Sequence, residues 1–190
     1  MRGRPQRVHR QDFNTPGHAH ELTFSCYRRF NFLKAERTCN WLVESIERAR
    51  VKHDFDLWAF VIMPNHAHVI VRPRPEKYRI GRIRSGIKLP VAKQAIQFLI
   101  DNESPWLERI TRRRGHRTER LFWQSGGGYD RNITNGKTLL KMIEYLHDNP
   151  VRKEWCQRGS EWKWSSAAFY EGGKSPLTPD PIPAEWLTDT

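Results

Sequence analysis

The sequence predicts an α+β fold, specifically a ferredoxin-like sandwich in which an antiparallel sheet carries helices on one face. Two observations support this prediction: strand-like and helix-like patterns alternate along the chain, and a tight turn joins two of the strands. The length of 190 residues fits one ordinary domain. We expect a flexible basic arm at 1–16, a single domain at 17–170 and a proline-rich tail at 171–190.

The first half of the chain contains most of the expected sheet. Residues 1–16 hold four arginines and two prolines but few apolar groups, so they cannot bury enough surface to offset the entropy lost on ordering. Apolar residues alternate over 20–27, which predicts the first strand. Helical spacing of apolar residues over 34–50 predicts the first helix.

A β-hairpin is expected next. The run 55–63 is apolar and aromatic, Pro64-Asn65 is a turn signal, and 66–71 is again strand-like. The chain beyond Pro73 is basic, and helical spacing resumes over 91–100, which predicts a second helix.

The second half ends in the last predicted helix. Residues 109–120 contain six arginines and little to bury, so we expect a surface loop or a short helix end there. A short strand is expected at 129–134 after three glycines. Apolar residues at helical spacing predict a helix over 137–148, which Pro150 would stop. The tail holds four prolines and should drape over the surface.

The charge balance points to a polyanionic partner. With 33 Lys+Arg against 21 Asp+Glu, the formal net charge is +12, and arginine suits phosphate because its planar fork matches the oxygens. The alternative is a solvated charge run without a partner. The candidate contacts to nucleic acid are Arg112, Arg113, Arg114, Arg117 and Arg131.

Aromatic residues late in the chain have two interpretations. They could stack on unpaired bases, or they could simply fill the core. The candidates are Trp162, Trp164, Phe169 and Tyr170.

The three cysteines have neither disulfide-framework nor zinc-ligand spacing, so a reducing, cytoplasmic setting is expected. No run of about 18 apolar residues is present, and the basic N-terminus leads into no apolar segment, so neither membrane insertion nor secretion is expected.

A pair of histidines could bind a metal ion. His66 and His68 are two residues apart in a predicted strand, so they share a face with their Cα atoms about 6–7 Å apart. The signal is weak by itself, because His18-Ala19-His20 repeats the same tripeptide. Solvated or hydrogen-bonded histidines are the alternative for either pair.

Tyr145 and Asn149 lie four residues apart at the end of the last predicted helix, hence on one face of it. Spacing alone also allows a half-buried packing tyrosine and an asparagine near the helix end.

Several longer runs of sequence resemble one known family. They are FVIMPNHAHVIV (60–71), FWQSGGGYDRNI (122–133), IEYLHDNPVRKEW (143–155) and EWKWSSAAFY (161–170). Together they resemble the single-tyrosine HUH transposases, and most closely the REP-associated tyrosine transposases, over roughly residues 17–170.

This resemblance implies roles for particular residues. His66 and His68 would form the HUH strand and bind Mg²⁺ or Mn²⁺, Asn149 would complete the metal site, and Tyr145 would be the nucleophile. Tyr129 is the second candidate for the nucleophile.

The implied reaction cleaves and rejoins single-stranded, hairpin-forming DNA through a 5′-phosphotyrosine intermediate. The resemblance further implies a bacterial, nucleoid-associated protein that acts as a monomer or a homodimer. The alternatives are a metal-dependent nuclease that uses water, and a non-cleaving protein that binds DNA or RNA.

Overall fold

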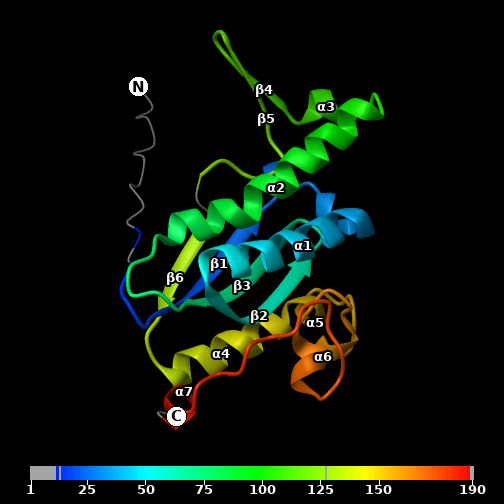
Figure 1. Ribbon diagram of the computed structural model, residues 1–190. Coiled ribbons are helices and arrows are strands. Elements are labelled where there is room, and N and C mark those ends of the chain that lie inside the picture. Colours follow the sequence, from blue (N-terminus) through cyan, green and yellow to red (C-terminus); the bar gives the residue numbers. More distant parts are fainter. Residues whose placement is uncertain (1–11, 13, 127, 189–190) are drawn as a thin grey trace, which may run out of the picture.

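A four-stranded antiparallel sheet forms the centre of the molecule, in the order β2-β3-β1-β6 (Figure 1). The computed structural model describes residues 12, 14–126 and 128–188. The strands are β1 (Ala19–Ser25), β2 (Phe55–Met63), β3 (His66–Pro73) and β6 (Tyr129–Ile133). The predicted α+β class, with its antiparallel sheet, and the hairpin turn at Pro64-Asn65 are confirmed.

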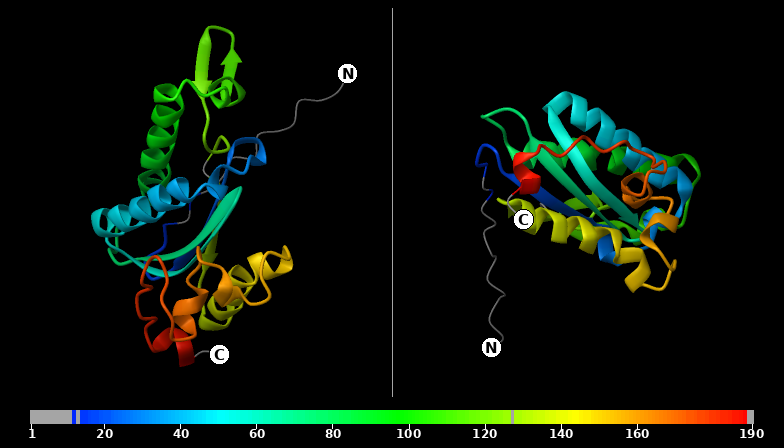
Figure 2. Two further views of the ribbon diagram at one scale, coloured as in Figure 1. Left: turned by 90° about the vertical axis from the view of Figure 1, so that its right-hand side faces the viewer. Right: turned by 90° about the horizontal axis from the view of Figure 1, so that it is seen from below.

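Helices cover both faces of the sheet (Figure 2). α1 (Glu36–His53) and α2 (Ile80–Asp101) pack on one face, and α4 (Gly136–His147) packs on the other. Helices on a single face were expected, and this detail differs because β2 is apolar on both sides. Two apolar cores result: the first lies between the sheet and α1 and α2, and the second lies between the sheet and α4. Every residue of β2 is buried, with Phe60 in the first core and Val61 in the second.

α2 begins earlier than the sequence pattern indicated. The predicted start was Val91, but the helix runs from Ile80 and continues through Pro90. Its first half is anchored by Ile83 and Ile87, which are buried against α1 and the sheet. The basic residues between these positions masked the helical spacing.

The arginine-rich segment forms a hairpin, so the expectation of a loop or helix end is wrong. β4 (Thr111–Arg114) pairs with β5 (Arg117–Arg120) after the short helix α3 (Trp106–Arg109), and the hairpin projects from the body of the molecule (Figures 1 and 2). Arg112 faces Glu119 across the two strands and forms an ion pair with it. Such a cross-strand pair of opposite charges favours the extended conformation.

The C-terminal region is more deeply packed than predicted. Its short helices are α5 (Asn149–Arg152), α6 (Ala167–Tyr170) and α7 (Glu185–Thr188). The tail was expected to drape over the surface, but Leu177 is buried in the first core and Trp186 in the second. Asp180 is also hydrogen-bonded to β2: its N–H donates to the Leu57 carbonyl at 2.7 Å, and its carboxylate Oδ2 accepts from the Leu57 N–H at 2.7 Å.

Only the end of the predicted N-terminal arm can be placed, since residues 1–11 and 13 lie outside the described residues. Asn14 accepts a hydrogen bond from the backbone N–H of Ile80 at 2.8 Å, and the Thr15 carbonyl accepts one from the Tyr78 hydroxyl at 2.9 Å. At these two residues the chain is anchored beside α2 rather than free. Across the described ranges, no helix has the length and apolar character that a bilayer span requires.

Candidate active site

His66 and His68 lie on the face of β3 that is turned toward α4. Ala67 and Val69 point into the opposite core, so the alternation predicted from the sequence is confirmed. The two imidazole centroids are 5.0 Å apart, and both rings are partly exposed. The strand therefore presents two imidazoles side by side on one surface.

A buried carboxylate orients His68. The Nδ1 atom of His68 lies 2.9 Å from Oε1 of Glu21 and 3.0 Å from Oγ1 of Thr23, both on the neighbouring strand β1. Thr23 also donates a hydrogen bond to Glu21 at 3.2 Å. A carboxylate at Nδ1 favours the proton on that nitrogen, which leaves the lone pair of Nε2 available for a ligand.

His66 is held in its neutral form. Its Nδ1 atom lies 2.6 Å from Oδ1 of Asn65, the turn residue before it. Burial, helped by the nearby His68, Arg29 and Lys153, lowers the pKa of His66 to about 4. Because a metal ion binds the neutral imidazole, this environment favours metal binding at neutral pH.

α4 places Tyr145 at the edge of the second core. Asn135 caps the helix by accepting a hydrogen bond from the Thr138 backbone N–H at 2.9 Å. Ile143 and Leu146 are buried against the sheet, whereas Tyr145 is 49% exposed. Its ring is covered on one side by Arg152, whose guanidinium carbon lies 3.9 Å from the ring centroid.

One cavity joins the tyrosine helix to the histidine strand. It has a volume of about 720 Å³, and both His68 and Tyr145 line it. The remaining lining residues are mostly polar or charged: Glu21, Thr23, Tyr129, Arg131, Thr138, Lys141 and Met142. The fold therefore brings a phenol, an imidazole and two cationic side chains to a single opening.

Asn149 occupies the start of α5, directly after the tyrosine helix. Its side chain is buried, and its Nδ2 donates to the carbonyls of Tyr145 at 3.1 Å and Leu146 at 3.4 Å. These bonds use the amide nitrogen and leave the oxygen Oδ1 as the acceptor. Neither Asn149 nor His66 is among the lining residues of the cavity.

The donor set fits a divalent cation only if an amide contributes. Within the part of the chain that the structure describes, no three His, Cys, Asp or Glu side chains come together as a metal site. Imidazoles whose Nδ1 atoms are hydrogen-bonded are the usual arrangement around a bound metal, and the amide oxygen of Asn149 is a hard ligand of the type that Mg²⁺ and Mn²⁺ accept. The side chains thus fit the metal that the resemblance implies.

The other histidine pair is structural. His20 is fully buried on the opposite face of the sheet, with Nδ1 3.0 Å from Asp130 and Nε2 2.7 Å from the Tyr78 hydroxyl. His18 lies 3.2 Å from the amide of Asn132 through its Nδ1. Both ring nitrogens of His20 are engaged, so this pair has the hydrogen-bonded role that the sequence left open.

The predicted DNA-contacting arginines occupy two different places. Arg131 lines the cavity beside Tyr145, on β6. The other four lie on the projecting hairpin, where Arg112 pairs with Glu119 and Arg113 pairs with Glu108. The remaining two hairpin arginines, Arg114 and Arg117, are exposed.

Three of the four aromatic candidates of residues 161–170 contact the sheet or the core beside it, whereas Phe169 is 37% exposed and packs against Tyr170. Trp162 donates its Nε1 proton to the Ile62 carbonyl at 2.9 Å, and the Tyr170 hydroxyl donates to the Trp58 carbonyl at 2.6 Å. Trp164 packs against the first core. These contacts favour a packing role and position the segment along β2.

The sequence interpretation did not include Glu21, Thr23 and Arg152. The first two are polar residues at strand spacing on the face opposite Leu22, which was a readable signal for a second functional face. The sequence could not show that Glu21 and Thr23 contact His68, because strand order and register are tertiary properties.

Comparison with solved structures supports the fold. The chain is similar to a REP-associated tyrosine transposase bound to a REP hairpin, with a TM-score of 0.58 and 18% identity over 95% of this chain and 96% of that chain. A candidate transposase from Deinococcus radiodurans R1 gives a TM-score of 0.44 and 13% identity over 77% of this chain and 97% of that one. No protein-family model and no curated protein sequence matches the chain. The resemblance predicted from the sequence is thus confirmed at the level of the fold.

Proposed function

We propose that this protein is a transposase that cleaves and rejoins single-stranded DNA, with Tyr145 as the nucleophile. The observation that carries the proposal is the cavity in which the exposed phenol of Tyr145 and the oriented imidazole of His68 meet. The fold shared with a REP-associated tyrosine transposase supports the same reaction class. That enzyme is bound to a hairpin, so we propose hairpin-forming DNA as the substrate here.

His66, His68 and Asn149 would hold the divalent cation. When bound, Mg²⁺ or Mn²⁺ would supply Lewis-acid polarisation of a phosphate oxygen. The protein orients both imidazoles by hydrogen bonds at Nδ1, to Asn65 for His66 and to Glu21 for His68. It therefore pre-organises the ligands before any ion arrives.

Tyr145 would attack phosphorus through its phenolic oxygen. The new bond joins that oxygen to the phosphate, and the bond from phosphorus to the 3′ oxygen breaks. The phenol gives up its proton to solvent, and the departing 3′ oxygen takes one up. A 5′-phosphotyrosine and a free 3′-hydroxyl result, and a second 3′-hydroxyl can reverse the step without an external energy source.

Three cationic residues lie around Tyr145: two would bind the DNA, and the third would orient the tyrosine. Arg131 and Lys141 line the cavity and offer charge to the phosphates on either side of the cleaved one. Arg152 stacks on the tyrosine ring and restricts its rotation. The hairpin arginines lie at a distance from this cavity and would contact the DNA backbone further along.

Covalent capture tests the proposal directly. The full chain is incubated with labelled hairpin DNA carrying randomised single-stranded flanks and Mn²⁺, and is then resolved on a denaturing gel. We expect a labelled band at the mass of the protein, which Tyr145→Phe and a chelator both abolish. Tyr129→Phe is the matched control, because Tyr129 is a half-exposed tyrosine in the same cavity, and it should keep the band.

The other outcomes separate the alternatives. A band lost in Tyr129→Phe and kept in Tyr145→Phe would transfer the role of nucleophile to Tyr129. Cleavage without a covalent band would indicate a nuclease that uses water. DNA that is bound but never cut would identify a non-cleaving binding protein and overturn the proposal.

A further inference from the structure

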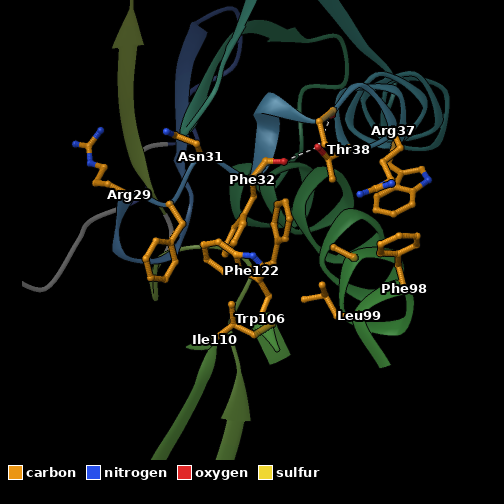
Figure 3. A pocket seen from close by; sticks show the side chains of 14 residues that line it. Arg29, Asn31, Phe32, Arg37, Thr38, Phe98, Leu99, Trp106, Ile110 and Phe122 are labelled. Atoms are coloured by element: carbon orange, nitrogen blue, oxygen red, sulfur yellow. Dashed lines mark hydrogen bonds between the residues drawn. The ribbon is translucent and has the colours of Figure 1, made fainter. Parts of the chain in front are cut away.

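A second cavity, of about 460 Å³, lies between the start of α1, the end of α2 and α3 (Figure 3). Its volume is within the roughly 300–1,000 Å³ range of ligand pockets. Six of its lining residues are aromatic. Phe32 and Phe122 are stacked with centroids 5.2 Å apart, and Trp106 meets the edges of Phe30 and Phe32 at 5.2 and 5.5 Å.

Arginines surround these rings. Arg29 and Arg37 line the cavity and lie on either side of the ring cluster in Figure 3. The guanidinium carbon of Arg37 lies 4.1 Å from the Phe98 centroid, and that of Arg109 lies 3.9 Å from the Trp106 centroid. None of the described residues that line the cavity is acidic. The site thus combines flat apolar surfaces with an exclusively positive rim.

We infer that this aromatic pocket binds an unpaired base of the single-stranded DNA, with the neighbouring phosphates on Arg29 and Arg37. The inference rests on the proposed function for the identity of the polymer. Stacking on aromatic rings beside a positively charged groove is the general way in which proteins hold unpaired bases.

The pocket is accessible from solvent. Arg29, Asn31 and Arg37 are exposed, while the rings of Phe30 and Trp106 are partly exposed. A base could therefore stack against the exposed parts of this ring cluster while its sugar and phosphates stay at the rim. Asn31 offers an amide at the same rim, where it could meet the edge of the base.

Backbone hydrogen bonds connect the pocket wall to the Pro64-Asn65 turn that precedes His66. The N–H of Cys26 donates to the Asn65 carbonyl at 2.8 Å, and the N–H of Leu33 donates to the Pro64 carbonyl at 2.8 Å. Asn65 in turn bonds the ring of His66. The segment between Cys26 and Leu33 therefore lies at the sheet end that carries His66, and Arg29 is part of this segment.

This connection identifies which base the pocket would take. Single-stranded DNA with a phosphate at His66 would pass Arg29 at this end of the sheet and then reach the ring cluster of the pocket. The pocket is thus suited to a base in the single-stranded segment that flanks the cleaved phosphate. Its occupation would hold that segment in register with Tyr145.

Binding measurements on short oligomers test the inference without cleavage. The probes are labelled dT8, dA8 and dC8, together with an abasic octamer that keeps the phosphates and lacks the bases. Loss of one base–aromatic stack should raise Kd by about 5- to 100-fold. We expect Trp106→Leu and Phe30→Leu to raise Kd for at least one base-bearing octamer by this amount and to leave the abasic octamer unchanged.

Control variants separate the pocket from general effects. Trp155→Leu removes an exposed tryptophan that lies outside the pocket and should bind every probe like wild type. Arg37→Gln should weaken the base-bearing and abasic octamers alike, since it removes a phosphate contact. Thermal melting of each variant shows whether the fold is kept.

The inference is overturned if both ring variants, folded by that measure, bind all base-bearing octamers as wild type does. It is also overturned if the abasic octamer weakens equally, because the pocket would then act only on phosphates. The octamer measurements require no cleavage. A failure of the covalent reaction would therefore leave this result standing, and the two proposals can fail separately.

Discussion

Glu21 is the residue that sets which nitrogen of His68 faces the cavity. Its carboxylate is buried and lies 2.9 Å from Nδ1, the position from which outer carboxylates orient metal-binding histidines. We expect Glu21→Gln to weaken Mn²⁺ binding about 10- to 100-fold, the usual cost of losing such a partner. Calorimetric titration of the full chain with Mn²⁺ measures this.

Glu47→Gln is the matched control, since Glu47 is exposed on α1 at the opposite face of the sheet. It should bind Mn²⁺ like wild type. Equal affinity in Glu21→Gln and wild type would contradict the orienting role.

At the scale of elements, a hydrogen bond joins the end of α4 to the segment 160–170. Nε2 of His147 lies 2.8 Å from Oγ of Ser166, which also donates to the Phe60 carbonyl on β2 at 3.2 Å. Burial lowers the pKa of His147 to about 4, although Asp148 and Glu171 act in the opposite direction. The helix that carries Tyr145 is thus joined through a neutral histidine to the edge of the sheet.

This depressed pKa predicts a loss of stability in acid. The unfolded chain binds the His147 proton near pH 6.5 and the folded chain only near pH 4, so the unfolded state gains more protons between these values. The free energy of unfolding should therefore fall as the pH drops from 6.5 to 4, by on the order of 2 kcal/mol between pH 7 and 5 from this residue. His66 acts in the same direction.

Urea unfolding at pH 7 and at pH 5 measures the effect. His147→Gln should be less stable than wild type at pH 7 because it loses the bond to Ser166, but its stability should depend less on pH. If wild type and His147→Gln lose the same free energy of unfolding between pH 7 and pH 5, His147 does not contribute in this way.

At the scale of the whole molecule, the C-terminal tail completes the second core. Trp186 is buried with its ring centroid 5.0 Å from that of Trp58 on β2. Gly136, at the start of α4, allows this approach, because a Cβ there would lie only 1.8 Å from the Trp186 carbonyl oxygen. The tail therefore helps to hold the tyrosine helix against the sheet.

Removing the Trp186 side chain should be costly. We expect Trp186→Ala to lower the free energy of unfolding by about 3–5 kcal/mol, the usual range for a buried tryptophan. The neighbouring Leu187→Ala, at an exposed position of the same short helix, should cost far less. Urea unfolding of both full-length variants compares them, and equal losses would mean that the tail only covers the surface.

Strong local patterns were sufficient for much of the fold. Alternation in β1 and β3 and helical spacing in α1 and α4 placed these elements within a few residues of their observed bounds. The start of α2 was missed because its apolar positions are separated by basic residues, one of which, Arg84, is buried beside Asp12 and Asp130. A buried ion pair gives no apolar signal in the sequence.

The sequence by itself determined that His66 and His68 share a face, because side chains in a strand alternate. It also determined that Tyr145 lies near the end of the last long helix, with Asn149 four residues later, because Pro150 follows. Only the tertiary structure decided that β1 lies beside β3, which brings Glu21 to His68, and that α4 covers the free face of the sheet. The physical reason is that local propensity acts over a few residues, whereas strand order and the choice of face depend on how the whole chain buries two apolar surfaces at once.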